Sequence, residues 1–115
     1  MGVRTFNRFA VILKKKQPFL DWYKKLPDSD SDVTLEDLNE DPFVCLLPEF
    51  EEEEDMENCV EDNCDFIFEL QMDEWWQGED KWEKSLNWEK FNLWFDFSIC
   101  TVPLDLADEP LVFED

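Results

Sequence analysis

The sequence predicts an α+β fold: one small domain of 115 residues in which a sheet of about three strands packs mainly against helices on one face. Three short apolar runs, separated by segments with helical spacing, predict the element order β-α-α-β-α-α-β. The residues are 43% hydrophobic and 16% aromatic with only two glycines, which indicates a packed core despite the high charge. A chain of this length can bury such a core without disulfide bonds.

The first predicted strand is Phe6 to Lys15, FNRFAVILKK, whose apolar centre at residues 10–13 indicates a place inside the sheet. Pro18 then stands at an early position of a short predicted helix, where proline is tolerated because the first turn leaves its N–H groups unpaired. This helix must end at Pro27. Its apolar residues recur near helical spacing at Phe19, Leu20, Tyr23 and Leu26.

A second short helix is predicted where Thr34 and Asp37 have the spacing of a capping box, and this helix must stop before Pro42. The run from Phe43 to Leu47, FVCLL, is continuously apolar and bounded by prolines. This pattern predicts a central strand that is buried on both faces. The crossovers between the predicted strands are long enough to permit parallel neighbours, and the strand order stays open.

The most distinctive predicted element is one long helix from Glu51 to Trp76, EEEEDMENCVEDNCDFIFELQMDEWW. Helical spacing separates its side chains into an apolar face and an acidic face. The apolar face holds Met56, Val60, Cys64, Ile67 and Leu70, with Cys59 and Phe66 at its edge. The acidic row, as we call the opposite face, holds Glu57, Glu61, Asp65, Glu69 and Asp73. Repulsion along this row opposes the helix by roughly 1–2 kcal/mol, which burial of the apolar face must offset.

After the long helix, the polar segment QGEDKWEKSL contains Gly78 and is predicted to be an exposed loop. Asn87 can cap a helix over residues 88–95, whose aromatic residues share one face. Residues 97–102, FSICTV, predict the third strand, which Pro103 ends. The ends of the predicted domain 1–115, residues 1–5 and 104–115, are expected to be irregular arms.

The charge is large and unevenly distributed. The formal net charge is −21, from 31 acidic and 10 basic residues, and the first 26 residues hold seven of the basic ones. Direct nucleic-acid binding is therefore excluded as a leading function, because neutralising phosphates requires a basic surface. The asymmetry also predicts that Lys14, Lys15 and Lys16 dock against acidic neighbours in the same molecule.

The four cysteines form no C-x-x-C pair, and the chain contains no histidine to complete a mixed metal site. The expectation is reduced, buried thiols in a cytoplasmic protein that uses no metal and no cofactor. No apolar run reaches transmembrane length and no signal-peptide pattern is present, so no membrane contact is expected. The cysteines are Cys45, Cys59, Cys64 and Cys100.

Four segments carry a resemblance to other proteins: NRFAVILKKKQPFLDW (Asn7–Trp22), LLPE (Leu46–Glu49), FELQMDEWW (Phe68–Trp76) and FNLWFD (Phe91–Asp96). In these segments the chain resembles a family of short, acidic bacterial proteins of unknown function. The similarity spans nearly the whole chain and implies a bacterial, cytoplasmic, stand-alone domain. That family brings no established activity, substrate or catalytic residue to carry over.

An enzyme is the least favoured function, because histidine, the usual acid or base near neutral pH, is missing. Asp73 and Glu74 beside two tryptophans could form a glycosidase-like carboxylate site, or an oxygen-rich metal site with Asp62 or Asp65. A solvated helix end with packing tryptophans explains the same residues. No Gly-rich phosphate loop, nucleophile elbow or EF-hand loop is present, so we expect no catalytic residues and no metal ligands.

The leading expectation is a non-enzymatic protein-interaction or accessory module whose partner is a protein of unknown identity. Trp22, Trp88 and Trp94 fall on the apolar faces of predicted helices and are expected in the core. Trp76 and Trp82 flank the Gly78 loop and are the aromatic residues expected to contact a partner. The oligomeric state stays open.

The acidic row supports an alternative function. Its members rise about 6 Å apart along a helix, comparable with phosphates that recur about every 3.4 Å of duplex axis per strand. A nucleic-acid mimic, or an immunity-type inhibitor, would use the row to bind a basic nucleic-acid-binding protein. The polar face of any acidic helix has the same spacing, so the row by itself does not decide between these functions.

Overall fold

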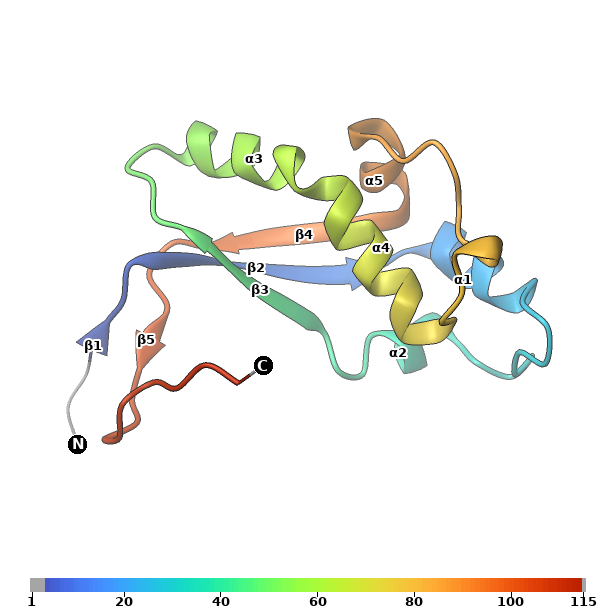
Figure 1. Cartoon of the computed structure of the whole chain (residues 1–115), viewed down its shortest axis with the longest axis horizontal. Helices are drawn as coiled ribbons and strands as arrows, with labels where there is room; N and C mark the ends of the chain where they lie inside the picture. Colours follow the sequence, from blue (N-terminus) through green and yellow to red (C-terminus); the bar gives the residue numbers. More distant parts are fainter. Residues whose placement is uncertain (1–3, 115) are drawn as a thin grey trace.

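The computed structural model describes residues 4–114 and confirms the α+β class (Figure 1). Helices lie on one side of the main sheet, and both sheets are antiparallel. The strands are β1 (Arg4–Thr5), β2 (Arg8–Lys15), β3 (Phe43–Pro48), β4 (Phe95–Cys100) and β5 (Leu104–Asp105). The helices are α1 (Gln17–Lys24), α2 (Leu35–Leu38), α3 (Glu53–Asp62), α4 (Cys64–Trp75), the 3-10 turn η1 (Glu79–Lys81) and α5 (Trp88–Trp94).

The main sheet has the strand order β3-β2-β4. The first predicted strand therefore lies inside the sheet, as expected, but both of its neighbours are antiparallel. The permitted parallel arrangement is not used because α1 and α2 lie beyond the end of β2, so the chain enters β3 from that end and runs back (Figure 1). The prediction of β3 as a central strand is wrong: β3 is an edge strand, and Val44 and Leu46 are 53% and 46% exposed. Its prolines stand at the strand boundaries, where they remove no hydrogen bond from the interior of a sheet.

The two ends of the chain are not wholly irregular, which corrects the prediction for residues 1–5 and 104–115. Arg4 pairs with Asp105 and Thr5 with Leu104 in a separate two-stranded ladder. The Arg4 guanidinium also donates to the carboxylate of Asp105 at 3.4 Å and to the carbonyl oxygen of Glu109 at 3.2 Å. Residues 1–3 and 115, which the prediction also covered, lie outside the described residues. Residues 106–114 form no helix or strand.

The prediction of one continuous helix from Glu51 to Trp76 is also wrong. The helical segment begins at Glu53 and is broken at Asn63, whose φ of −107° and ψ of 3° separate α3 from α4. The Asn63 side-chain amide donates to the carbonyl oxygen of Cys59 at 2.8 Å. A side chain that bonds the backbone in this way competes with helix continuation, which is why asparagine favours helix ends. The expected order of elements therefore changes: two helices replace one, and two short strands flank the predicted series.

The buried face of α4 differs in part from the predicted one. Met56, Val60, Cys64 and Ile67 are buried, as predicted, but Leu70 is 38% exposed and Phe66 is 59% exposed. In α4 the buried positions follow i, i+3, i+4 spacing from Cys64, which excludes Leu70 from that face. Its further buried residues are Phe68, Gln71 and Met72.

The core lies between the helices and the helix-facing side of β2. Phe68 is fully buried and packs edge-on against Phe95 with ring centroids 4.9 Å apart. The ring centroid of Trp94 lies 5.0 Å from that of Phe68. Trp22 and Trp94 are buried as predicted, and Trp88 packs partly buried against the core. This packing joins the sheet to α4 and α5, and it therefore fixes both ends of the segment that connects these two helices.

Both predicted helix caps are confirmed. Thr34 Oγ1 accepts from the Asp37 N–H at 3.2 Å, and the Asp37 carboxylate accepts from the Thr34 N–H at 2.9 Å, which completes a capping box at α2. Asn87 Oδ1 accepts from the Lys90 N–H at 2.7 Å at the start of α5. The second cap fixes the end of the 79–86 segment that borders the candidate site.

Candidate functional site

All five members of the acidic row are exposed. Glu57 and Glu61 lie on α3, whereas Asp65, Glu69 and Asp73 lie on α4, beyond the break at Asn63. Within residues 4–114, none of these carboxylates forms an ion pair with a basic side chain. The row therefore presents uncompensated negative charge to solvent, but on two helices rather than on one continuous line.

The lysines predicted to dock against acidic neighbours do so only in part. Lys16 Nζ lies 3.9 Å from a carboxylate oxygen of Asp96 on β4. Lys14 is exposed, whereas Lys15 is 5% exposed and is attracted to Glu74 and Asp41 at longer range. The basic N-terminal segment thus leaves the acidic row uncovered.

The two tryptophans of the predicted aromatic loop are held by the backbone on either side of η1. Trp76 caps the end of α4 and Trp82 follows η1; both are half-buried and pack against the core. The Trp82 indole N–H donates to the carbonyl oxygen of Trp76 at 2.9 Å. The Trp76 indole N–H lies 3.5 Å from a carboxylate oxygen of Asp80.

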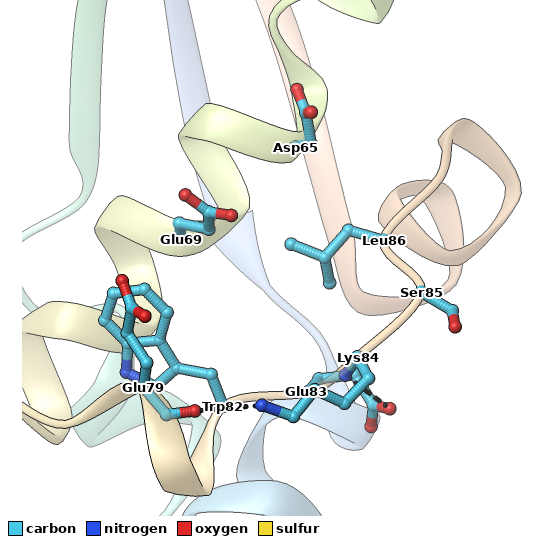
Figure 2. A pocket seen from close by; sticks show the side chains of 8 residues that line it. All are labelled: Asp65, Glu69, Glu79, Trp82, Glu83, Lys84, Ser85 and Leu86. Atoms are coloured by element: carbon cyan, nitrogen blue, oxygen red, sulfur yellow. Dashed lines mark hydrogen bonds between the residues drawn. The ribbon is translucent and has the colours of Figure 1, made fainter.

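A cleft of about 350 Å³ separates α4 from the 79–86 segment (Figure 2). Asp65 and Glu69 border it from α4, and the side chain of Leu86 lies between the segment and that helix (Figure 2). Trp82 supplies the aromatic wall. Of the residues that the sequence predicted to bind a partner, the cleft brings together two carboxylates of the acidic row and one of the two tryptophans. Glu57, Glu61, Asp73 and Trp76 do not line it.

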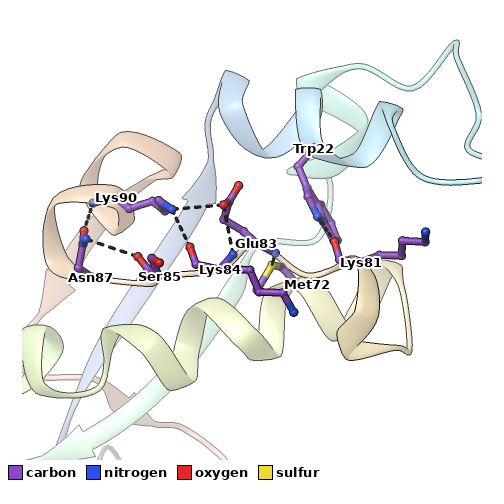
Figure 3. Close-up of polar contacts among 8 residues, drawn as sticks. All are labelled: Trp22, Met72, Lys81, Glu83, Lys84, Ser85, Asn87 and Lys90. Carbon is purple, nitrogen blue, oxygen red and sulfur yellow. Dashed lines mark hydrogen bonds and ion pairs between the residues drawn. The ribbon is translucent and has the colours of Figure 1, made fainter.

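The 79–86 segment is anchored along its length by hydrogen bonds to three helices (Figure 3). The Trp22 indole of α1 donates to the carbonyl oxygen of Lys81 at 2.8 Å, and Lys90 Nζ of α5 donates to that of Lys84 at 2.7 Å. The Glu83 N–H lies 3.3 Å from the sulfur of Met72 on α4. The predicted exposed loop is therefore a fixed wall of the cleft, since its backbone has partners at successive positions.

One residue of this wall has a strained backbone. Ser85 lines the cleft and has a φ of 56°, in the left-handed region that side chains with a Cβ rarely adopt. Such a conformation costs on the order of 1–3 kcal/mol and persists only where surrounding contacts impose it. The cap at Asn87 and the Lys90 hydrogen bond to Lys84 lie on either side of Ser85 and supply those contacts.

The cleft combines negative charge with apolar surface. Asp65, Glu69, Glu79 and Glu83 give four carboxylates against the single ammonium of Lys84, a formal charge of −3. Lys84 Nζ donates to the carbonyl oxygen of Glu79 at 3.1 Å, and Glu83 pairs with Lys90 Nζ at 3.3 Å. Asp65 and Glu69 form no ion pair in residues 4–114, so these two carboxylates beside Trp82 and Leu86 can receive a cation that has an apolar stem.

Three of the four thiols are disfavoured as nucleophiles. Burial raises the pKa of the Cys45, Cys59 and Cys64 thiols, which disfavours the nucleophilic thiolate. The alternative of a metal site formed by Asp73 and Glu74 with Asp62 or Asp65 finds no support, because no cluster of three possible ligands occurs among the described residues. Glu74 instead lines a different cavity, beside Lys15.

Leu86, Ser85 and Glu83 are residues of the cleft that the sequence did not identify. A polar segment with Gly78 is typical of a free loop, and this interpretation gave no packing role to Trp82 in the middle of the segment or to Leu86 at its end. Those two residues, together with the Asn87 cap, were the available signal that the segment packs against the neighbouring helices.

No protein-family model, curated protein or solved structure matches the chain. In the described part of the chain, no helix is both long and apolar enough to cross a bilayer.

Proposed function

We propose that this protein is a non-enzymatic interaction module that binds a cationic segment of a partner protein in the cleft between α4 and the 79–86 segment. The observation that carries the proposal is the placement of Asp65 and Glu69, exposed and without ion-pair partners in residues 4–114, beside Trp82 and Leu86. This combination differs from a merely solvated acidic helix face because it adds a shaped apolar wall to the charge.

The side chain that suits this cleft is arginine or lysine. Its methylene stem would lie along Leu86. Its cationic group would lie between Asp65 and Glu69 and against the face of Trp82. A planar guanidinium also bonds two oxygens at once, so arginine is the favoured anchor. Anchors of this kind, set in a pocket and surrounded by weaker contacts, dominate the energy of protein interfaces.

The charge outside the cleft would act at longer range. A molecule with a net charge of −21 attracts a basic partner before contact, which raises the association rate and makes it sensitive to salt. The remaining members of the acidic row would therefore speed the encounter, whereas the cleft would set the lifetime of the complex. We place this module in the bacterial cytoplasm, as the resemblance to short acidic bacterial proteins implies.

A second candidate function is mimicry of a nucleic acid, with a nucleic-acid-binding protein as the basic partner. The observation in its favour is that all five carboxylates of the acidic row face solvent and form no ion pair with a basic side chain in residues 4–114. The break at Asn63 counts against it, because it interrupts the linear spacing that mimicry of a strand requires. The two functions differ in whether α3 contributes to affinity.

The test is binding of a labelled arginine-rich peptide, measured by fluorescence anisotropy at two salt concentrations. The double variant Asp65→Asn/Glu69→Gln should weaken binding by roughly tenfold or more, as expected when charge-assisted hydrogen bonds are lost. A control, Glu36→Gln/Glu114→Gln, removes the same charge at exposed positions outside the row and should change affinity much less.

A third double variant, Glu57→Gln/Glu61→Gln, separates the two functions. If it weakens binding as much as the cleft variant does, the acidic row acts as a mimic and the cleft is not the main site. If the cleft variant binds as tightly as its control, the proposed site is wrong.

A further inference from the structure

The second cavity of interest surrounds Lys15, the last residue of β2. Strand alternation puts Lys15 on the helix-facing side with Phe9, Val11 and Leu13, and only 5% of it is exposed. Its Nζ lies 5.4 Å from the centre of the Phe19 ring. The ammonium makes no hydrogen bond and no ion pair with any described residue. The side chain has thus lost most of its contact with water, and its ammonium gains only the face of an aromatic ring in place of a hydrogen-bond acceptor among the described residues.

Lys15 borders a cavity of about 330 Å³ between α2 and the end of α4. Trp75 forms another wall, and its buried indole N–H has no acceptor in the part of the chain that the structure describes. The Trp75 ring is held in place by an edge-on contact with Tyr23, with ring centroids 5.2 Å apart. Two residues that line one cavity thus carry donors without a hydrogen-bond acceptor among the described residues, and the Trp75 donor is itself fully buried. A buried unpaired donor is costly unless something from outside supplies its partner.

Four carboxylates and Leu38 form the rest of the cavity lining. Asp37, Glu40, Asp41 and Glu74 contribute four negative charges against the single positive charge of Lys15, a formal charge of −3. All four of these residues are exposed, whereas Lys15 is buried. The lining is therefore polarised, with hydrogen-bond donors inside and negative charge towards solvent.

The backbone around the cavity is fixed before any ligand arrives. The Asn39 side chain accepts from the Lys15 N–H at 2.7 Å and donates to the Lys15 carbonyl oxygen at 3.0 Å, which ties β2 to the end of α2. The Thr34 capping box holds the first turn of α2 at Asp37. A preformed site of this volume falls within the usual range for small-molecule pockets, which begins near 300 Å³.

We infer that this cavity binds a free basic α-amino acid. The ligand carboxylate would accept hydrogen bonds from Lys15 Nζ and the Trp75 indole N–H, and its cationic nitrogens would bind the outer carboxylates. A ligand with one carboxylate and two cationic nitrogens matches both ends of the cavity, whereas a simple anion meets repulsion at the mouth and a simple cation leaves the inner donors unpaired. This site is separate from the cleft, which binds a side chain of a partner and has no buried ammonium.

Burial lowers the pKa of Lys15, while Glu74 and Asp41 act to raise it. A ligand carboxylate beside Nζ would also raise the pKa of Lys15, because it favours the charged ammonium. Binding therefore removes part of the electrostatic penalty that the empty cavity imposes on Lys15.

The experiment uses the full chain, with L-arginine as the probe, isothermal titration calorimetry for affinity and the indole N–H signals in a ¹H–¹⁵N spectrum for location. The variant Trp75→Phe identifies the Trp75 signal, which should shift on saturable binding. Agmatine lacks the carboxylate, and 5-aminovalerate lacks one cationic nitrogen, so each should bind roughly tenfold or more weakly than L-arginine.

Lys15→Met keeps the apolar stem but removes the donor, and it should weaken arginine binding by roughly tenfold or more. The matched control is Lys14→Met, which removes the same charge from the exposed neighbouring position and should bind normally. If Lys15→Met unfolds, as judged by near-ultraviolet circular dichroism of the tryptophans, Trp75→Phe and Glu74→Gln test the same site without altering the buried lysine.

The cleft variant Asp65→Asn/Glu69→Gln distinguishes failure of this inference from failure of the proposed function. Arginine that binds only in the cleft would lose affinity in that variant and keep it in Lys15→Met, which would overturn the cavity assignment. The absence of saturable arginine binding to the native chain would also overturn it. Binding that depends on Lys15 and Trp75 but not on Asp65 and Glu69 supports it.

Discussion

The indole N–H of Trp82 donates to the backbone carbonyl oxygen of Trp76 at 2.9 Å, which closes the turn between α4 and the 79–86 segment. This bond satisfies a carbonyl group at the end of α4, where helix geometry leaves acceptors unpaired. It also orients the Trp82 ring along the cleft, so the same contact that ends the helix forms the aromatic wall of the candidate site.

Trp82→Phe keeps the aromatic ring but removes this hydrogen bond. We expect the free energy of unfolding to fall by about 0.5–1.5 kcal/mol, as measured by urea denaturation. Trp88→Phe is the control, because Trp88 stacks on Phe91 and its indole donates no hydrogen bond in the described chain. Equal losses in the two variants would show that ring size, and not the hydrogen bond to Trp76, sets the cost.

Ser85→Gly should stabilise the protein by up to about 1 kcal/mol. Glycine adopts a φ of 56° without a Cβ clash, and this gain exceeds the greater freedom of glycine in the unfolded chain. Ser98→Gly, at an exposed position of β4, should instead destabilise by roughly 0.5–1 kcal/mol. Thermal melts of both variants check the pair, and a loss of stability in Ser85→Gly would mean that the serine side chain makes a compensating contact.

Gln71→Met should raise the free energy of unfolding by about 1–3 kcal/mol. Gln71 is fully buried in α4, and neither its amide nitrogen nor its amide oxygen has a hydrogen-bond partner among residues 4–114. Methionine has a similar shape and avoids the desolvation penalty of an unpaired amide. Gln77→Met, at an exposed position, should change stability by less than about 0.5 kcal/mol. Destabilisation by Gln71→Met would reveal that buried water or a ligand pairs with the amide.

The corrected orientation of α4 predicts a contrast between two alanine variants. Ile67 is 3% exposed, so Ile67→Ala should cost about 2–5 kcal/mol in the free energy of unfolding. Leu70, which the sequence placed on the same face, is 38% exposed, and Leu70→Ala should cost clearly less. Chemical denaturation measures both. A loss under about 1 kcal/mol for Ile67→Ala would contradict the orientation of the helix.

The pH dependence of stability should report the burial of Lys15. Its pKa is lowered from 10.5 chiefly by burial, so between the lowered pKa and 10.5 the folded state binds fewer protons than the unfolded state. Stability from this group therefore rises with pH across that window and is constant below it. Comparing native and Lys15→Met chains cancels the other groups, and the native chain should gain relative to the variant as pH rises. No relative change up to pH 10.5 would show that Nζ is solvated.

Several features of this fold could be predicted from local sequence because local chemistry controls them. The caps at Thr34 and Asn87 follow from side chains that bond backbone groups within one turn. The apolar centre of β2 indicated a strand inside the sheet, and Met56, Val60 and Ile67 were correctly placed in the core. These features depend on periodicity and on neighbours within a few residues.

Features that depend on distant segments were predicted wrongly or not at all. A continuous apolar run could not distinguish β3 at the sheet edge from a central strand, because the difference lies in which strands come to neighbour it. The pairing of Arg4 with Asp105 joins the two ends of the chain and has no local signal. The break at Asn63 is a different case, because the sequence did contain a local signal for it: asparagine in the middle of a long helix competes for backbone hydrogen bonds.

By itself, the sequence determined the α+β class, the charge of −21 and the solvent exposure of the acidic row, because composition and helical spacing fix these properties. Only the tertiary structure decided which carboxylates acquire an aromatic neighbour. Asp65 and Glu69 meet Trp82 because the 79–86 segment packs along α4, and Glu74 comes near Lys15 because β2 ends beside that helix. These neighbours are far apart along the chain, so their contacts arise only when packing of the shared core brings the elements together.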